Sequence, residues 1–353
     1  MRRWLKISGV LVLALLAILL LTVGYMQFVR PFTPSFKDDR GRPLPGSIAS
    51  LEKIKLGGLD QWILVRGRNR TNPVVLFLHG GPGMPAMYLA HRFQRPLEDR
   101  FVMVQWDQRG AGKSYSPRIP PQAMRMDNLI SDACELAGLL KERFHQDRIF
   151  LVGHSFGSYL GMLTVSRHPE LFYAFVGIGQ VVEHDKSKEL QDRFIRENAR
   201  ARNEGRILAE FEAKGDRVRE ELIFRYGGEL YRSTSIWPLL VTGFLAPEYT
   251  FRDILNIPRG VAFTHRNIDY TDRERPLVDL VTAVPIPVYF FTGRHDYTTP
   301  VAMVEVYYQK LRAPRKELVW FEESAHFPFF EEPEKFAEEM ERVRRETLAG
   351  EGQ

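Results

Sequence analysis

The segment Gly153-His-Ser-Phe-Gly157 has the pattern Gly-x-Ser-x-Gly, in which a serine hydroxyl can act as a nucleophile. It directly follows an apolar run at 149–152 and precedes a helical pattern at 158–167. The two glycines leave room for a sharp strand-to-helix turn that holds the serine in a strained conformation at its tip. This context predicts a nucleophile elbow with Ser155 as the nucleophile.

A serine hydroxyl also needs a general base within hydrogen-bond reach, and a carboxylate that orients this base. Asp296 follows an apolar run that ends at Thr292, and His326 follows another that ends near Phe321. Both side chains should therefore lie at the carboxyl ends of strands, where the sites of parallel sheets form. We predict that His326 is the general base and that Asp296 orients it, in the chain order Ser, Asp, His.

Other residues compete for these two roles. His295 is a second candidate base, but a side chain next to Asp296 in the chain is badly placed to bridge it to Ser155. Asp185 and Glu323 are alternative carboxylates.

The tetrahedral intermediate of acyl transfer needs hydrogen-bond donors for its oxyanion. The glycine-rich segment His79-Gly-Gly-Pro-Gly83 follows the apolar run 74–78 and exposes backbone amides in a tight turn. We expect the N–H groups of Gly81 and Phe156 to form the oxyanion hole, and His79 to be a structural residue of the turn.

The segment Gly110-Ala-Gly-Lys-Ser114 resembles the end of a phosphate-binding loop. That motif requires a glycine five positions before Gly112, where this chain has Asp107. We therefore expect a structural turn, with Asp107 and Arg109 in an ion pair, and no phosphate site.

The elements that must position these residues are short apolar runs, which are typical of strands buried on both faces of a parallel sheet. They predict strands at 74–78, 101–106, 149–152, 174–178, 288–292 and 318–321. A hairpin around Gly57-Gly58 precedes them, and an amphipathic helix capped by Asp127 links the second and third. The fold class is α/β, with a mostly parallel central sheet flanked by helices.

Two segments do not fit the pattern of buried strands linked by helices, and they define the domain organisation. Charged, helix-prone and aromatic residues between two predicted strands indicate an inserted helical lid, and an apolar N-terminal run indicates a transmembrane helix. The expected parts are a cytoplasmic N-terminus (1–6), a membrane anchor (7–25), a tether (26–46), the core (47–180 and 286–353) and the lid (181–285).

Arg2, Arg3 and Lys6 precede the apolar run and should hold the N-terminus in the cytoplasm, with the catalytic domain outside. A cleaved signal peptide is the alternative, although the run ends in a poor cleavage site. We therefore expect a single-pass membrane protein.

Composition excludes several function classes. The net charge of +5 comes from basic residues interleaved with acidic ones, so we expect no nucleic-acid partner. The single cysteine, Cys134, rules out an internal disulfide and a cysteine-built zinc site. No metal-ligand spacing is present, and we expect neither a metal nor a cofactor.

Five motifs together resemble the proline iminopeptidase branch of the α/β-hydrolases. They are His79–Gly83, Asp107–Ser114, Gly153–Gly157, Gly293–Asp296 and Ser324–His326. The resemblance covers about 73–179 and 287–333. It implies an aminopeptidase that removes an N-terminal residue, often proline, from short peptides, without metal or cofactor. It assigns the triad to Ser155, Asp296 and His326, and the oxyanion hole to Gly81 and Phe156.

Two departures from the family pattern concern the substrate. Members of the branch carry Gly-Gly-Ser-Trp-Gly at the elbow, whereas Gly-His-Ser-Phe-Gly is common among esterases and lipases. The peptidases also bind the free amine of the substrate through acidic lid residues. The candidates here, chosen by charge, are Glu183, Glu210, Glu212 and Glu229.

The first functional hypothesis is therefore a serine aminopeptidase acting on small peptides. The second is a carboxylesterase or lipase acting on acyl esters near the membrane, and a free-amine requirement would separate the two. A non-catalytic binding protein on the same scaffold is the third, which the complete triad disfavours. Dehalogenase or epoxide-hydrolase chemistry would place aspartate, not serine, at position 155.

Overall fold

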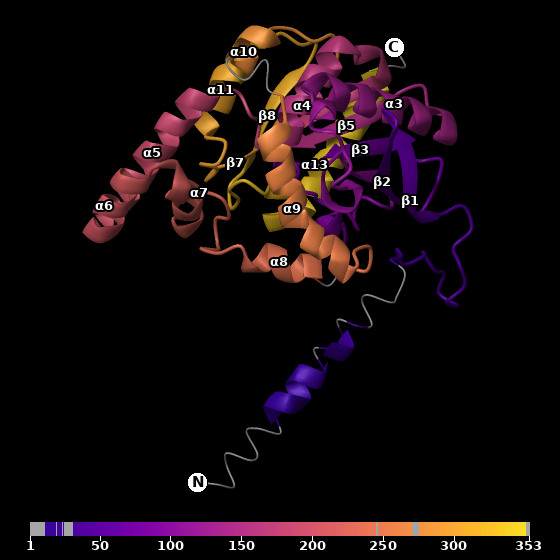
Figure 1. Cartoon of the computed structure of the whole chain (residues 1–353). Helices are drawn as coiled ribbons and strands as arrows, with labels where there is room; N and C mark the ends of the chain where they lie inside the picture. Colours follow the sequence, from indigo (N-terminus) through magenta and orange to yellow (C-terminus); the bar gives the residue numbers. More distant parts are fainter. Residues whose placement is uncertain are drawn as a thin grey trace.

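The structure is a computed structural model that describes residues 11–18, 20–22, 24, 31–244, 246–269 and 275–350. Its centre is an eight-stranded sheet with helices on both faces (Figure 1). The strands are β1 (Ile48–Leu56), β2 (Leu59–Gly67), β3 (Val74–Leu78), β4 (Val102–Asp107), β5 (Ile149–His154), β6 (Phe172–Ile178), β7 (Val288–Gly293) and β8 (Lys316–Phe321).

The strand order is β1-β2-β4-β3-β5-β6-β7-β8. β1 and β2 form the predicted hairpin, which turns at Gly57 and Gly58 with φ of 53° and 77°. β2 is also antiparallel to β4, and every later pair from β4 to β8 is parallel. The prediction of a mostly parallel sheet is therefore confirmed.

Each central strand is buried on both faces, which explains its almost continuous apolar sequence. In β3, Val74, Leu76 and Leu78 join one hydrophobic core, while Val75 and Phe77 join the other. The first core packs against α3 (Met126–Phe144), α4 (Phe156–Arg167) and α11 (Val301–Lys310). The second packs against α2 (Ala90–Phe93), α12 (Pro328–Glu331) and α13 (Pro333–Gly350).

Two local predictions were wrong. Asp127 does not cap α3, because the residue at the cap position is Arg125, and Asp127 lies in the first turn and pairs with Arg167 at 2.7 Å. Asp107 and Arg109 do not pair with each other. The turn after Asp107 folds back so that this carboxylate accepts from the Lys113 N–H, while Arg109 points to α3.

Between β6 and β7 the chain forms a helical insertion, by which we mean residues 181–285. Residues 245 and 270–274 lie outside the described part. Its helices are α5 (His184–Ala201), α6 (Gly205–Lys214), α7 (Asp216–Arg225), α8 (Trp237–Phe244), α9 (Phe251–Asn267) and α10 (Leu277–Leu280). In Figure 1, α5 to α7 project to one side of the sheet, while α8 and α9 lie at the end nearest the N-terminal segment.

The predicted anchor at 7–25 falls partly outside the described residues, and the described positions 11–18 and 20–22 are helical. Within the part of the chain that the structure describes, no helix combines the length and apolarity needed to cross a bilayer. The main chain joins the folded part at Phe32, whose N–H donates to the Pro247 carbonyl at 3.2 Å.

Candidate active site

Ser155 lies between the last residue of β5 and the first residue of α4, with φ of 54° and ψ of −122°. A positive φ is uncommon for a residue with a side chain and marks a strained turn. The Ser155 N–H donates to the Ile178 carbonyl of β6 at 2.9 Å, which fixes the turn to the neighbouring strand. The predicted sharp strand-to-helix turn is present.

The glycines on either side of this turn have no room for a side chain. A Cβ atom at Gly153 would lie 2.2 Å from the Gly157 carbonyl oxygen. One at Gly157 would lie 2.2 Å from the Leu78 carbonyl oxygen of β3. The Gly-x-Ser-x-Gly pattern therefore reflects backbone-to-backbone packing of the elbow.

His326 and Asp296 form a buried pair, with 2.9 Å between Nδ1 and Oδ2. An ionised carboxylate only accepts hydrogen bonds, so Nδ1 carries the proton and Nε2 of the neutral ring is the acceptor. Ser155 and His326 line the same cavity of about 650 Å³. The structure thus brings the three predicted residues together at the carboxyl ends of β5, β7 and β8.

Thr299 is a further residue of this site, which the sequence reasoning missed. Its N–H donates to Asp296 Oδ1 at 2.8 Å and its hydroxyl donates to Oδ2 at 2.7 Å. The sequence signal was the threonine three residues after Asp296, a spacing at which a carboxylate can accept from the local backbone. These bonds orient the carboxylate toward His326.

The loop that carries His326 is held from three sides. The His326 N–H donates to the Glu229 carbonyl at 3.0 Å, and its carbonyl is 2.9 Å from His154 Nε2. The Ala325 N–H donates to the Glu331 carboxylate at 2.8 Å. Gly179 leaves space for the imidazole, because a Cβ atom there would lie 2.7 Å from Nδ1 of the ring. The role of Glu331 in holding this loop was not predicted, because Glu331 belongs to no recognisable motif.

Burial of the His326 ring by itself lowers its pKa, but the negative charges of Asp296 and Glu229 outweigh this effect. The pKa of His326 is therefore raised to about 9. The charged imidazolium is stabilised in this site, which a general base that takes a proton from a serine would require.

The glycine-rich turn lies against the elbow. A Cβ atom at Gly80 would come within 2.9 Å of the Ser155 Cβ. Gly81 has φ of 111°, a conformation that favours glycine. Gly81, Ser155 and Phe156 line a second cavity of about 260 Å³, which places both predicted oxyanion-hole residues beside the serine.

His79 has a structural role in this turn, as expected. Its Nε2 accepts from the Gln108 N–H at 3.1 Å. Burial lowers its pKa to about 4, so the ring is neutral at pH 7.

The four acidic candidates for amine binding separate into two groups. Glu229 lines the larger cavity with Ser155, and Glu183 lines the smaller one, where it pairs with Lys186 at 3.1 Å. Glu210 and Glu212 are not brought to either cavity. They lie on α6, where they pair with Lys214 at 2.6 Å and Arg196 at 2.8 Å.

Burial raises the pKa of Glu229 to about 7, and its carboxylate accepts from the Thr298 hydroxyl. Among the ion pairs of the described residues, none includes Glu229. A cation that enters the cavity would therefore meet a carboxylate whose charge acts on the His326 ring but which forms no ion pair with a lysine or arginine of the described residues.

The competing base and carboxylates lie elsewhere. The His295 ring stacks on Tyr231 with 3.7 Å between ring centres. Glu323 is exposed and pairs with Arg232, and Asp185 lies in the first turn of α5. None of the three is among the described residues that line the two cavities.

A mostly parallel eight-stranded sheet with a serine on a strand-to-helix elbow defines a hydrolase of the α/β class. A family model for the alpha/beta hydrolase fold matches residues 73–333. The chain belongs to the α/β-hydrolase family, and within it is proline iminopeptidase-like.

Curated relatives cover most of the chain. A probable aminopeptidase, YbaC of Bacillus subtilis, is 33% identical over 321 residues, covering 87% of this chain and 99% of the relative. The proline iminopeptidase of Saccharolobus solfataricus is 26% identical over 292 residues, covering 78% of this chain and 84% of its own length. These relatives support a hydrolase activity.

Solved structures share the fold at lower identity. Proline iminopeptidase from Mycobacterium smegmatis superposes with a TM-score of 0.66 at 17% identity, covering 85% of this chain and 100% of that one. A membrane phospholipase A, described as a bacterial virulence factor, gives 0.63 at 22% identity and covers 99% of both chains.

Proposed function

We propose that the chain is a serine aminopeptidase of the proline iminopeptidase type, which releases the N-terminal residue of short peptides through an acyl-enzyme. Ser155 attacks the carbonyl carbon of the first peptide bond while His326 Nε2 takes the hydroxyl proton. The same proton then goes to the leaving amine, and water hydrolyses the ester of Ser155 by the reverse sequence of proton transfers.

Asp296 holds the imidazole in the productive tautomer and stabilises its charged form. The N–H groups of Gly81 and Phe156 donate to the oxyanion. Removing one donor of such a hole typically costs about a hundredfold or more in rate.

The observation that carries the aminopeptidase assignment is the position of Glu229. Its carboxylate lies in the wall of the cavity that holds Ser155 and His326. A substrate with a free N-terminal ammonium near the scissile bond would pair with this carboxylate, which desolvation makes a strong partner for a cation. Glu183, at the smaller cavity, is a second candidate.

A carboxylesterase or lipase is the alternative, and one observation favours it. A largely apolar cavity of about 900 Å³ shares Met84, Tyr88 and Val261 with the cavity of Ser155. An acyl chain bound there could reach the serine.

We also propose that residues 7–25 hold the enzyme at a membrane with its N-terminus in the cytoplasm. The support is the uncharged apolar run, its length close to that of a bilayer span, and the preceding Arg2, Arg3 and Lys6.

The test uses the purified full chain in mild detergent with three substrates: proline p-nitroanilide, its N-acetylated form and p-nitrophenyl butyrate. Hydrolysis of the free-amine anilide, its loss on acetylation, and its loss in Ser155→Ala are the expected results. Glu229→Gln should raise KM for the free-amine substrate by about tenfold or more, since it removes a charge-assisted bond. Cleavage of the butyrate alone would contradict the aminopeptidase proposal and support an esterase. Activity retained in Ser155→Ala would show that Ser155 is not the nucleophile.

A further inference from the structure

The helices α8 and α9, together with Ile236 just before α8, expose large apolar side chains to solvent. Ile236, Trp237, Leu240, Val241 and Leu255 are 41%, 67%, 47%, 53% and 46% exposed, and we call these five residues the α8–α9 face. On α8, Trp237, Leu240 and Val241 have the i, i+3, i+4 spacing of one helix side. Contiguous exposed apolar groups of this size mark interaction surfaces.

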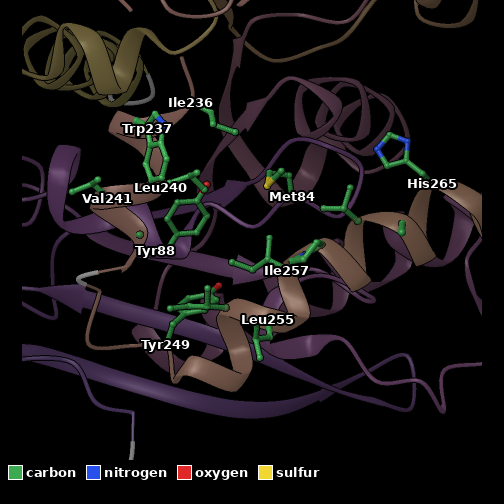
Figure 2. A pocket seen from close by; sticks show the side chains of 15 residues that line it. Met84, Tyr88, Ile236, Trp237, Leu240, Val241, Tyr249, Leu255, Ile257 and His265 are labelled. Carbon is green, nitrogen blue, oxygen red and sulfur yellow. The ribbon is translucent and has the colours of Figure 1, made fainter. Parts of the chain in front are cut away.

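The face surrounds an apolar groove, shown in Figure 2. Trp237, Leu240 and Val241 border it from α8, and Leu255 and Ile257 border it from α9. The groove is the cavity of about 900 Å³ that adjoins the cavity of Ser155. The groove under the α8–α9 face and the cavity of Ser155 therefore share part of one wall, which includes Met84, Tyr88 and Val261.

A row of arginines runs beside this apolar surface. Arg252, Arg259 and Arg266 are exposed on α9 at intervals of seven residues, which places them on one stripe next to Leu255. Within the described ranges, none of the three forms an ion pair with a carboxylate. An apolar side flanked by unneutralised arginines is typical of helices that lie in the headgroup region of a membrane.

The point where the chain enters the fold lies at the same place. Phe32, which is 52% exposed, binds the Pro247 carbonyl between α8 and α9. The apolar run 7–25 ends only seven residues before Phe32. The described part of the N-terminal helix lies on the side of the molecule where α8 and α9 are found (Figure 1).

We propose that the α8–α9 face docks on an anionic lipid bilayer. Trp237, Leu240 and Val241 enter the boundary between headgroups and acyl chains, and the three arginines bind lipid phosphates. Docking places the groove, which shares part of its wall with the cavity of Ser155, at the bilayer surface. A second copy of the chain fits the face less well, because paired faces would bring two arginine rows together.

The experiment uses the full chain reconstituted in vesicles, with its one cysteine replaced by Cys134→Ser. A fluorophore sensitive to polarity is attached to Val241→Cys on α8 or to Val306→Cys on α11. Val306 is the matched control, since it is an exposed helical valine (43%) outside the face. The vesicles contain phosphatidylcholine with or without phosphatidylglycerol, and nitroxide-labelled lipid quenches only fluorophores that touch the bilayer.

We expect the emission at position 241 to shift to the blue and to be quenched by nitroxide lipid, and that at 306 to change in neither respect. The quenching at 241 should increase with phosphatidylglycerol. Arg252→Gln, Arg259→Gln and Arg266→Gln should each lower the ratio of docked to undocked protein by about fivefold, from the usual contribution of an arginine at an anionic surface.

Four outcomes would overturn the proposal. Equal quenching at 241 and 306 would mean nonspecific adsorption. A blue shift without lipid that grows with protein concentration would assign the face to a second copy. A blue shift that is independent of concentration and insensitive to nitroxide would assign it to the chain's own N-terminal run. If the quenching at 241 changed neither with phosphatidylglycerol content nor in the arginine variants, the partner would not be an anionic lipid. None of these results depends on which acyl bond Ser155 cleaves.

Discussion

At the residue scale, the base of the proposed mechanism is surrounded by carboxylates that favour its charged form. Asp296 and Glu229 both favour the charged form of His326 and raise its pKa to about 9. The reaction needs the neutral imidazole, so kcat/KM should increase as pH rises through this pKa and fall below it. We expect an alkaline activity profile, measured as kcat/KM against pH with a substrate that has no titrating amine, such as p-nitrophenyl butyrate.

Replacing Glu229 by glutamine removes one of the three carboxylate charges that stabilise the imidazolium, those of Asp296, Glu229 and Glu331. The apparent pKa of the base should then fall by about one pH unit, so the variant would be active at lower pH than the parent. Glu212→Gln is the matched control, because Glu212 lies on α6 and pairs with Arg196. An unchanged profile in Glu229→Gln would show that this carboxylate does not act on His326.

At the element scale, α3 is tied to the sheet by a buried ion pair. Asp132 accepts from two nitrogens of Arg109 at 2.6 and 2.7 Å and from Gln61 of β2 at 2.7 Å. Asp132→Ala leaves the arginine buried without its partner, which typically costs about 3–5 kcal/mol of unfolding free energy. Urea denaturation followed by circular dichroism should show this loss.

The control on the same helix is Asp127→Ala, which removes an exposed pair with Arg167. Such surface pairs contribute about 0–1 kcal/mol. Similar losses in the two variants would mean that burial does not decide the strength of these pairs, contrary to the argument for Asp132.

At the scale of the whole molecule, an ion pair and a hydrogen bond hold the helical insertion against the core. Lys113, from the turn after β4, binds Asp253 at 2.7 Å and is only 2% exposed. Tyr249 donates its hydroxyl to Asp107 at 2.5 Å, and burial raises the pKa of that carboxyl to about 7. These contacts fix the start of α9. This helix contributes Val261 to the wall shared by the apolar groove and the cavity of Ser155.

Lys113→Met should loosen the insertion without unfolding the sheet. It leaves Asp253 without its buried cation, so amide hydrogen exchange in α9 should become at least about tenfold faster while β5 and β6 stay protected. Lys186→Met is the matched control, because Lys186 is 62% exposed. Faster exchange throughout the sheet would mean that Lys113 stabilises the whole fold rather than the boundary.

The sequence by itself determined the elements whose signals are local. Residues 149–157 combine an apolar strand with two glycines and a serine, and the elbow follows because these neighbours in the chain are also neighbours in space. The buried strands and the hairpin at Gly57 were predictable for the same reason. The role of Asp127 was misjudged because α3 begins earlier than expected. That of Asp107 was misjudged because Arg109 pairs with Asp132, a residue distant in sequence.

Only the tertiary structure decided which acidic side chains belong to the site. Glu229 and Glu212 look alike in the sequence, yet one lines the cavity of Ser155 and the other pairs with Arg196 on the outside. The same holds for Glu331, which supports the His326 loop, whereas Thr299 lies only three residues from the Asp296 carboxylate that it supports. The type of a residue sets the charge that its side chain can carry. Its burial and its partners depend on how helices and strands far apart in the chain pack together.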